Sequence, residues 1–257
     1  MQLDGRVALV TGGGSGLGEA ASRLLVAEGS RVAVLGRSDE ELRHVLSDLG
    51  AAAMPVVADI SKSDEMERAC RQVVDRWGRL DIVFANAGVN GVWASLEDLT
   101  PEEWRRTLDI NLTGTFFTVK YAVPYMKERG GSVIITSSVN GTRMFSNTGA
   151  TAYSCSKAGQ VAFTKMVALE LAPKKIRVNV ICPGAIHTNI EQNTERRNLE
   201  EIKAPVEFPE GIVPLNEGRP GTAEQVARLV LFLASDAADH ISGTEIWIDG
   251  AESLLQG

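Results

Sequence analysis

The sequence lacks several features by which large classes of protein are recognised. No apolar run approaches the roughly 20 residues that span a bilayer, and residues 1–6 show neither the basic segment nor the apolar core of a signal peptide. The 26 basic residues are outnumbered by 33 acidic ones, which leaves a formal net charge of -7. Such a charge disfavours nucleic acid and anionic membranes as partners. We therefore expect a cytoplasmic protein.

Cysteine and histidine are scarce, with three of each in 257 residues. They are Cys70, Cys155, Cys182, His44, His187 and His240. The cysteines are odd in number and have no disulfide spacing, which suits a reducing compartment, and the histidines lack metal-ligand spacing, so no metal site is expected. Cys155 and His187 do not belong to the set of nucleophile, base and orienting group that a hydrolase needs. His187 is kept as a candidate substrate contact.

Short β-branched runs alternate with segments of helical period along the whole chain. The expected strands cover residues 6–11, 31–35, 54–58, 80–85, 132–136, 177–182 and 245–248. Many of these runs are apolar on both faces, which indicates a parallel sheet covered on both sides. We predict an α/β fold with one domain over residues 1–257: a doubly wound, Rossmann-type parallel sheet of about seven strands with helices on both faces.

Local signals mark where several helices begin. Ser38 is followed three residues later by Glu41, and Thr222 by Gln225, and each pair predicts a capping box. Pro101 stands where a first helical turn tolerates proline. The signals place one helix after the strand that ends near residue 35, one that begins near residue 100, and one before the last strand.

Residues 186–215 break this rhythm. The segment lies between a strand and a late helix, is rich in charge and contains Pro205, Pro209 and Pro214. A long insertion in a compact domain is often functional, so we interpret it as a substrate lid. The alternative is a solvated surface excursion.

The glycine-rich turn after the first strand is a candidate phosphate site. Residues 11–18 read TGGGSGLG, which fits the spacing TGxxxGxG rather than GxGxxG. Backbone N–H groups at such a turn, together with the positive end of the following helix, favour a pyrophosphate. The predicted contacts are Gly12, Gly14, Ser15, Gly16, Leu17 and Gly18. A tight connection without a ligand is the alternative.

Tyr153 and Lys157 stand four residues apart on an expected helix, so they project from one face. A nearby ammonium favours the phenolate and is expected to lower the pKa of the tyrosine from its usual value of about 10. The pair is therefore a candidate for moving a proton to or from an alcohol. A solvated or snorkelling pair is the alternative.

These motifs occur together with Asn86-Ala87-Gly88, Asn111, Ser138 and Pro183-Gly184 followed by Thr188. In this order the set resembles the classical short-chain dehydrogenase/reductase family, over about residues 3–250. The resemblance implies hydride transfer between a nicotinamide cofactor and a small-molecule ketone or secondary alcohol. A protein that senses dinucleotides or serves as a scaffold without turnover is the alternative, but it would need no proton donor.

The resemblance implies a role for each of four catalytic residues. Tyr153 exchanges the proton with the substrate oxygen, and Lys157 lowers its pKa and holds the nicotinamide ribose. Ser138 orients the substrate oxygen; it is preferred to Ser137 because Val139-Asn-Gly141 follows it. Asn111 distorts its helix and holds a water that links the lysine to solvent, whereas a solvent-facing amide is the alternative.

The resemblance also implies further cofactor contacts. They come from Asp59, Ile60, Asn86, Ala87, Gly88, Pro183, Gly184, Ile186 and Thr188, in addition to Tyr153 and Lys157. Asp59 is placed at the adenine amino group, residues 86–88 on the adenine ribose side, and Thr188 at the nicotinamide carboxamide.

The end of the second strand bears on the choice between NADP and NAD. Gly36 stands where NAD-preferring relatives carry aspartate, Arg37 can clamp a ribose phosphate, and Ser38 can add a hydrogen bond. Ser15, in contrast, stands where many NADP-preferring relatives carry a basic residue. The balance favours NADP, with NAD as the alternative.

The substrate and the assembly are less well specified. The loop of residues 142–149 is expected to border the substrate pocket, where Arg143, Asn147 and Thr148 would favour a polar substrate. Family members commonly form dimers or tetramers, so we expect a homo-oligomer. Trp247 and the tail of residues 251–257 could extend such an interface.

Overall fold

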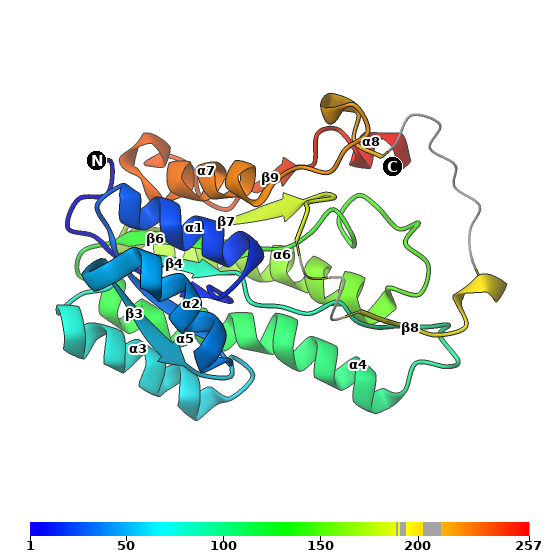
Figure 1. Ribbon diagram of the computed structural model, residues 1–257, viewed down its shortest axis with the longest axis horizontal. Helices are drawn as coiled ribbons and strands as arrows, with labels where there is room; N and C mark the ends of the chain where they lie inside the picture. Colours follow the sequence, from blue (N-terminus) through cyan, green and yellow to red (C-terminus); the bar gives the residue numbers. More distant parts are fainter. Residues whose placement is uncertain (189, 191–193, 203–211, 257) are drawn as a thin grey trace.

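A seven-stranded parallel sheet lies at the centre of the molecule, as predicted (Figure 1). The computed structural model describes residues 1–188, 190, 194–202 and 212–256. The strand order is β3-β2-β1-β4-β6-β7-β9. The strands are β1 (Val7–Thr11), β2 (Arg31–Gly36), β3 (Ala53–Val57), β4 (Ile82–Ala85), β6 (Gly131–Thr136), β7 (Ile176–Pro183) and β9 (Glu245–Ile248). All seven were predicted to within about two residues, the usual uncertainty of an element's end.

Helices cover both faces of the sheet. One face packs against α1 (Gly16–Ala27), α2 (Asp39–Leu49) and α7 (Ala223–Ala234), and the other against α3 (Ser63–Trp77), α5 (Gly114–Met126) and α6 (Thr151–Leu171). In β1, Val7 and Leu9 belong to one core and Ala8 and Val10 to the other, and all four are fully buried. Successive side chains of a strand point to opposite faces, so such a strand must be apolar throughout. Of the helices described, none is long and apolar enough to cross a bilayer.

The path of the chain reverses across the sheet between β1 and β4. Strands β2 and β3 lie on one side of β1, and β4, β6, β7 and β9 lie on the other. Open α/β sheets bind ligands at such a point, beyond the carboxyl ends of the strands. Thr11 joins the two strand ends: its hydroxyl accepts hydrogen bonds from the N–H groups of Asn86 (3.0 Å) and Ala87 (3.1 Å). The two walls of the crevice are thus held in a fixed relation.

Arginines and a buried carboxylate lie at the other end of the sheet, where the strands begin. Arg6 and Arg177 donate hydrogen bonds to carbonyls at the C-terminal end of α7, where cations also offset the negative end of the helix dipole. Asp81 is buried, accepts a hydrogen bond from the N–H of Val7 (2.9 Å) and forms a bidentate pair with Arg79. This basic cluster is therefore accounted for by the fold.

A second, two-stranded sheet was not predicted. β5 (Gly91–Trp93) pairs in parallel with β8 (Thr194–Arg196), which belongs to the segment interpreted as a lid. Strands of three residues are too short to show a period of two, and these two are far apart in the sequence. Residues 189, 191–193 and 203–211 of the predicted lid, with Pro205 and Pro209 among them, lie outside the described part of the chain.

One of the two predicted capping boxes is complete. Thr222 and Gln225 each bond to the other's backbone N–H at the start of α7. Ser38 accepts a hydrogen bond from the N–H of Glu41 (3.3 Å), but within the described residues the return bond is not formed, so the predicted box is half wrong. The Glu41 carboxylate turns instead towards the glycine turn, where a Cβ on Gly14 would stand 3.5 Å from it.

Candidate active site

A groove follows the carboxyl ends of β1 and β4 and consists of two recesses that share part of their lining. The inner recess contains the predicted residues Gly12, Ser15, Gly16, Leu17, Asn86, Ala87, Gly88, Ser138, Tyr153, Lys157, Pro183, Gly184, Ile186 and Thr188. The outer recess contains Gly12, Gly14, Ser15, Arg37, Ser38, Asp59, Ile60, Ala87 and Gly88. The structure therefore brings together all the predicted site residues except Gly18 and Asn111, which lie behind the lining.

The glycine turn lies so close to the loop that follows β4 that no side chain fits between the two backbones. Gly12 has a φ of +64°, and a Cβ on it would stand 3.0 Å from the Cα of Ala87. Gly18 serves packing rather than the groove, since its Cβ would collide with the carbonyl of Gly12 at 2.1 Å. Ser15 precedes α1, and no described side chain caps that helix. The free N–H groups of its first turn thus remain available for an anion.

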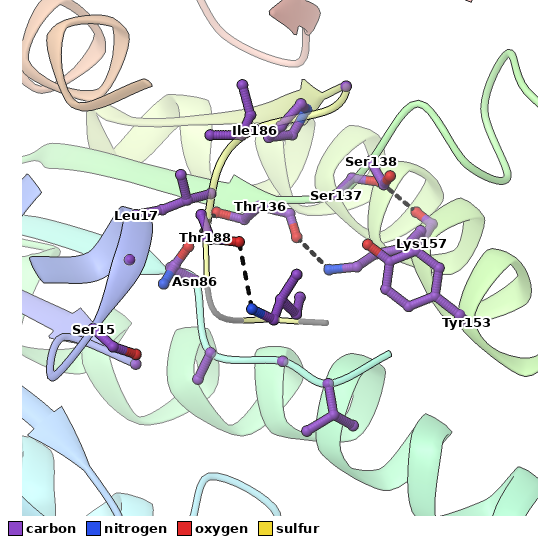
Figure 2. Close-up of a pocket in the computed structure, with 18 residues that line it drawn as sticks. Ser15, Leu17, Asn86, Thr136, Ser137, Ser138, Tyr153, Lys157, Ile186 and Thr188 are labelled. Atoms are coloured by element: carbon purple, nitrogen blue, oxygen red, sulfur yellow. Dashed lines mark hydrogen bonds between the residues drawn. The ribbon is translucent and has the colours of Figure 1, made fainter. Parts of the chain in front are cut away.

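Tyr153, Lys157 and Ser138 meet in the inner recess (Figure 2). Tyr153 and Lys157 lie one turn apart on α6 and are 8% and 4% exposed, and Ser138 follows β6. The hydroxyl of Ser138 lies close enough to the Tyr153 phenol to act on its pKa. The Lys157 ammonium donates to the carbonyl of Thr136 (2.8 Å) and lies 5.5 Å from the centroid of the Tyr153 ring. A solvated Tyr–Lys pair is excluded.

The geometry distinguishes the two adjacent serines. The hydroxyl of Ser137 donates to the backbone carbonyl of Lys157 (2.8 Å) and thereby holds β6 against α6. Ser138 faces Tyr153, and its oxygen also accepts from the N–H of Asn140 (3.1 Å). Ser138 is therefore the serine placed to meet a substrate oxygen beside the phenol.

Burial dominates the pKa values of both groups on α6. It raises the pKa of Tyr153 above its usual value, although the hydrogen bond from Ser138 acts in the opposite direction. It also lowers the pKa of Lys157 from 10.5 to about 8. The prediction that the pKa of Tyr153 is lowered is therefore wrong for the protein alone, because loss of hydration outweighs the effect of Ser138. The phenol holds its proton more tightly than a free tyrosine does.

Asn111 lies at a helix distortion, as predicted, but its amide is used inside the protein. It is fully buried in a π-helical turn, Asp109–Thr113, that separates α4 (Pro101–Leu108) from α5. Its Oδ1 accepts from the N–H of Val89 (2.8 Å), and its Nδ2 donates to the carbonyl of Val89 (2.9 Å) and to Ser156 (3.0 Å). A solvent-facing amide is excluded, and the water-holding role stays a prediction.

The backbone carbonyl of Asn111 is also occupied. It accepts hydrogen bonds from the hydroxyl of Thr115 (2.7 Å) and from the side-chain amide of Gln160 (2.8 Å). On the groove side, a Cβ on Gly88 would stand 3.1 Å from Oδ1 of Asn111 and 3.7 Å from Nζ of Lys157. Asn111 thus fixes the loop after β4 against the lysine from behind.

Charged side chains of both signs line the outer recess. Arg37 is exposed at its rim, together with Ser38 and Glu41. Burial tends to raise the pKa of Asp59, but hydrogen bonds from the N–H (2.9 Å) and hydroxyl (2.8 Å) of Ser61, with the charge of Arg37, lower it overall. Asp59 therefore presents a carboxylate, not a carboxylic acid, at neutral pH.

Sequence reasoning missed several lining residues. They are Val89, Thr136 and Ile190 in the inner recess, and Leu35, Glu41, Ala58 and Ile110 in the outer recess. The spacing of Glu41 from Ser38 predicts a helix cap, and the sequence carries no separate signal that its side chain faces the glycine turn. The apolar residues carry no pattern that separates them from the core.

The loop of residues 142–149 uses its polar side chains within the fold. The guanidinium of Arg143 stacks 3.6 Å from the centroid of the Trp247 ring, and the amide of Asn147 donates to Oδ1 of Asn140 (2.6 Å). Within the described residues, none of this loop lines the inner recess. The apolar side chains Val89 and Ile190 stand there instead.

The doubly wound sheet and the glycine turn at its switch point define a protein that binds a nucleotide. A family model described as short chain dehydrogenase matches residues 6–199. The chain is 36% identical to the 3-oxoacyl-(acyl-carrier-protein) reductase FabG of Thermotoga maritima, over 97% of this chain and 98% of that protein. It is 34% identical to the trans-4-hydroxycyclohexanecarboxylate dehydrogenase of Sinomonas cyclohexanicum, over 96% and 93%.

Solved structures agree with this assignment. A 3-ketoacyl-ACP reductase from Sinorhizobium meliloti is 49% identical, with a TM-score of 0.94 over 97% of this chain and 99% of that chain. A reductase of the same description from Brucella melitensis, complexed with NADH, is 29% identical, with a TM-score of 0.87 over 98% and 99%. The chain belongs to the short-chain dehydrogenase/reductase family and is an oxidoreductase that acts between alcohols and ketones.

Proposed function

We propose that this enzyme interconverts a ketone and a secondary alcohol with NADP as its preferred cofactor, and that Tyr153, Lys157, Ser138 and Asn111 carry the chemistry. The observation behind the proposal is the pair of buried hydroxyls, of Ser138 and Tyr153, that line one recess beside the Lys157 ammonium. A dinucleotide sensor or scaffold would need the groove but not this pair. The nicotinamide, when bound, supplies the hydride to the substrate carbon or accepts it.

The hydroxyls act on the substrate oxygen. In reduction, Ser138 donates a hydrogen bond to the carbonyl oxygen, and Tyr153 transfers its proton to that oxygen as negative charge develops there. A raised pKa keeps the phenol protonated and ready to donate. The Lys157 ammonium stabilises the phenolate that remains, in a setting where burial makes that charge costly. Asn111 keeps the Gly88–Val89 loop in place behind the lysine.

The groove divides naturally between the two halves of a dinucleotide. The inner recess, with the catalytic hydroxyls and Thr188, suits the nicotinamide half, and the outer recess, with Arg37 and Asp59, suits the adenosine half. The glycine turn lies between them, where the free N–H groups of α1 favour the pyrophosphate.

The preference for NADP rests on the outer recess and on a shallow hollow beyond it. Arg37 and Ser38 stand after Gly36, and the hollow adds Lys62, Arg105 and Arg106 against Asp59, Glu102 and Asp109. These basic side chains favour a ribose phosphate. Glu41 and Asp59 act in the opposite direction, so we expect a moderate preference rather than exclusion of NAD.

The proposal extends to the surroundings of the site. Residues 1–257 form one catalytic domain, and residues 186–215 serve as a substrate lid, tied at Arg197 to Glu103 of α4. Exposed apolar side chains on α5 and α6, such as Phe116 and Met166, support assembly into a dimer or tetramer. The excess of acidic residues suits the cytoplasm.

A cofactor-absorbance screen tests this function. NADPH and NADH are each offered with a panel that includes a 3-oxoacyl thioester and cyclic ketones, because the relatives act on such different compounds. We expect turnover with at least one ketone that carries an apolar substituent, since Val89, Ile186 and Ile190 line the inner recess, and a higher kcat/KM with NADPH. Binding of cofactor without turnover of any carbonyl or alcohol would favour the sensor.

A further inference from the structure

A buried carboxylate lies directly behind the segment that carries Ile186 and Thr188 into the groove. Glu252 comes from the tail after β9, is 6% exposed, and accepts a hydrogen bond at Oε2 from the N–H of Ala185 (2.5 Å). A Cβ on Gly184 would stand 2.3 Å from the same oxygen. The carboxylate therefore packs against the backbone of the lining segment without intervening atoms.

The tail turn is built to direct Glu252 inwards. Asp249 accepts hydrogen bonds from the N–H groups of Ala251 (3.2 Å) and Ser253 (3.0 Å) and from the hydroxyl of Ser253 (2.5 Å). Ala251 has a φ of +71°, in the left-handed region that is strained for a non-glycine residue. A strained residue held by such a network commonly marks a functional constraint.

The lining segment is held from its other side as well. The carbonyl of Ala185 accepts from the N–H of Gly221 (2.9 Å), and the N–H of His187 donates to the carbonyl of Gly221 (2.9 Å). Glu252 thus supplies the remaining bond to Ala185, so that both backbone polar groups of this residue are engaged. Figure 2 shows Ile186 and Thr188 following from this anchored point into the inner recess.

Stability alone does not account for a carboxylate here. Burial, with the nearby Asp249 charge, raises the pKa of Glu252 despite the hydrogen bond from Ala185. An apolar side chain would fill the space without the cost of desolvating a charge. What the carboxylate adds is a directed acceptor for the Ala185 N–H.

We propose that Glu252 is a positioning residue, which fixes residues 184–188 so that Ile186 and Thr188 shape the nicotinamide end of the groove. This inference rests on the proposed binding of a dinucleotide. The expected effect is selective. Loss of the acceptor weakens binding of the nicotinamide half of the cofactor and leaves binding of the adenosine half unaffected, because this segment does not line the outer recess.

The test measures dissociation constants for NADPH, by its fluorescence, and for 2′,5′-ADP, by calorimetry. For Glu252→Ala we expect the Kd of NADPH to rise about tenfold, the effect of one unsatisfied buried N–H group, and the Kd of 2′,5′-ADP to stay within about twofold. Glu252→Gln restores NADPH binding, because its side-chain oxygen can accept from Ala185. If Glu252→Ala does not fold, Glu252→Asp carries the test, since its shorter chain reaches Ala185 poorly.

Asp81→Asn is the matched control. Asp81 is also a buried carboxylate that accepts from a backbone N–H, but at the other end of the sheet. It is expected to lower stability and leave both constants unchanged. Unchanged NADPH binding in Glu252→Ala, or equal weakening of both ligands, overturns the inference. Failure of the wild-type protein to bind any dinucleotide overturns the proposed function instead, and the inference with it.

Discussion

Lys157 is a buried ammonium, and its titration should be visible in the stability of the protein. Burial lowers its pKa from 10.5 to about 8. Between these values the unfolded chain keeps a proton that the folded chain has released, so stability rises with pH. Relative to Lys157→Met, the wild type should gain about 2 kcal/mol in free energy of unfolding between about pH 7.5 and 9.5. Urea unfolding at the two pH values measures it, and a difference independent of pH would contradict it.

Arg37 is the residue on which the cofactor preference most depends. Arg37→Asp replaces a partner for the ribose phosphate with a repelling charge and should lower the NADP-to-NAD ratio of kcat/KM by about tenfold or more. Arg43→Asp is the control, because Arg43 lies nearby in the chain, on α2, but outside the recess, where it pairs with Asp39. Equal ratios in the two variants would show that the effect is one of overall charge.

At the scale of single residues, the sequence predicted which residues form the site better than it predicted the surroundings of each side chain. Spacing and resemblance indicated Tyr153 and Lys157, and the structure places both in one recess. The direction of the Tyr153 pKa could not be predicted, because it depends on burial, which other elements supply. The same holds for Asn111, whose partner Val89 lies on a loop from another strand.

Among the elements, the segment that includes β8 is held by one compact ion-pair cluster. Arg197 donates to the carbonyl of Asp98 (3.1 Å) and to carboxylates of Glu103 (2.5 Å) and Glu195 (2.9 Å). The Arg197 guanidinium, with the N–H of Thr100, lowers the pKa of Glu103 to about 2. The stabilising effect is complete above the usual pKa of the carboxyl and is lost as pH falls through about 2.

Releasing this cluster should loosen the segment that includes β8. Arg197→Gln is expected to raise the rate of proteolysis within residues 194–202 several-fold, because local opening becomes easier when these contacts are lost. Arg196→Gln is the control, since Arg196 is the adjacent residue and lies more loosely, 5.4 Å from the centroid of the Trp93 ring. Mass spectrometry of the fragments locates the cuts; equal rates in both variants would contradict the role of Arg197.

The strands and helices of the main sheet were largely predictable from the sequence, because a parallel sheet with helices on both faces requires strands that are apolar throughout, and such runs are easily recognised. The small sheet of β5 and β8 was not, since its pairing depends on contacts such as the amide of Asn90 with Thr194 (2.7 Å). The return bond of the capping box at Ser38 is missing for a related reason: the groove competes with the helix end for the Glu41 side chain.

For the whole molecule, the exposed apolar face on α5 and α6 predicts self-association. Met166 is 75% exposed and Leu169 is 81% exposed, more than most large apolar side chains of a monomer require. Sedimentation should show a dimer or tetramer, and the double variant Met166→Glu, Leu169→Glu should shift it towards monomer. Leu96→Glu, 78% exposed but on a loop before α4, is the control. A monomeric wild type would contradict the prediction.

The central claim is that Tyr153 passes the proton, and Tyr153→Phe tests it most directly. The variant keeps the buried ring and removes only the hydroxyl. With a ketone that the wild type reduces, kcat should fall by a factor of about 10² to 10⁴, while the Kd of NADPH changes little. Turnover that persists at the wild-type rate, with cofactor binding intact, would contradict the account.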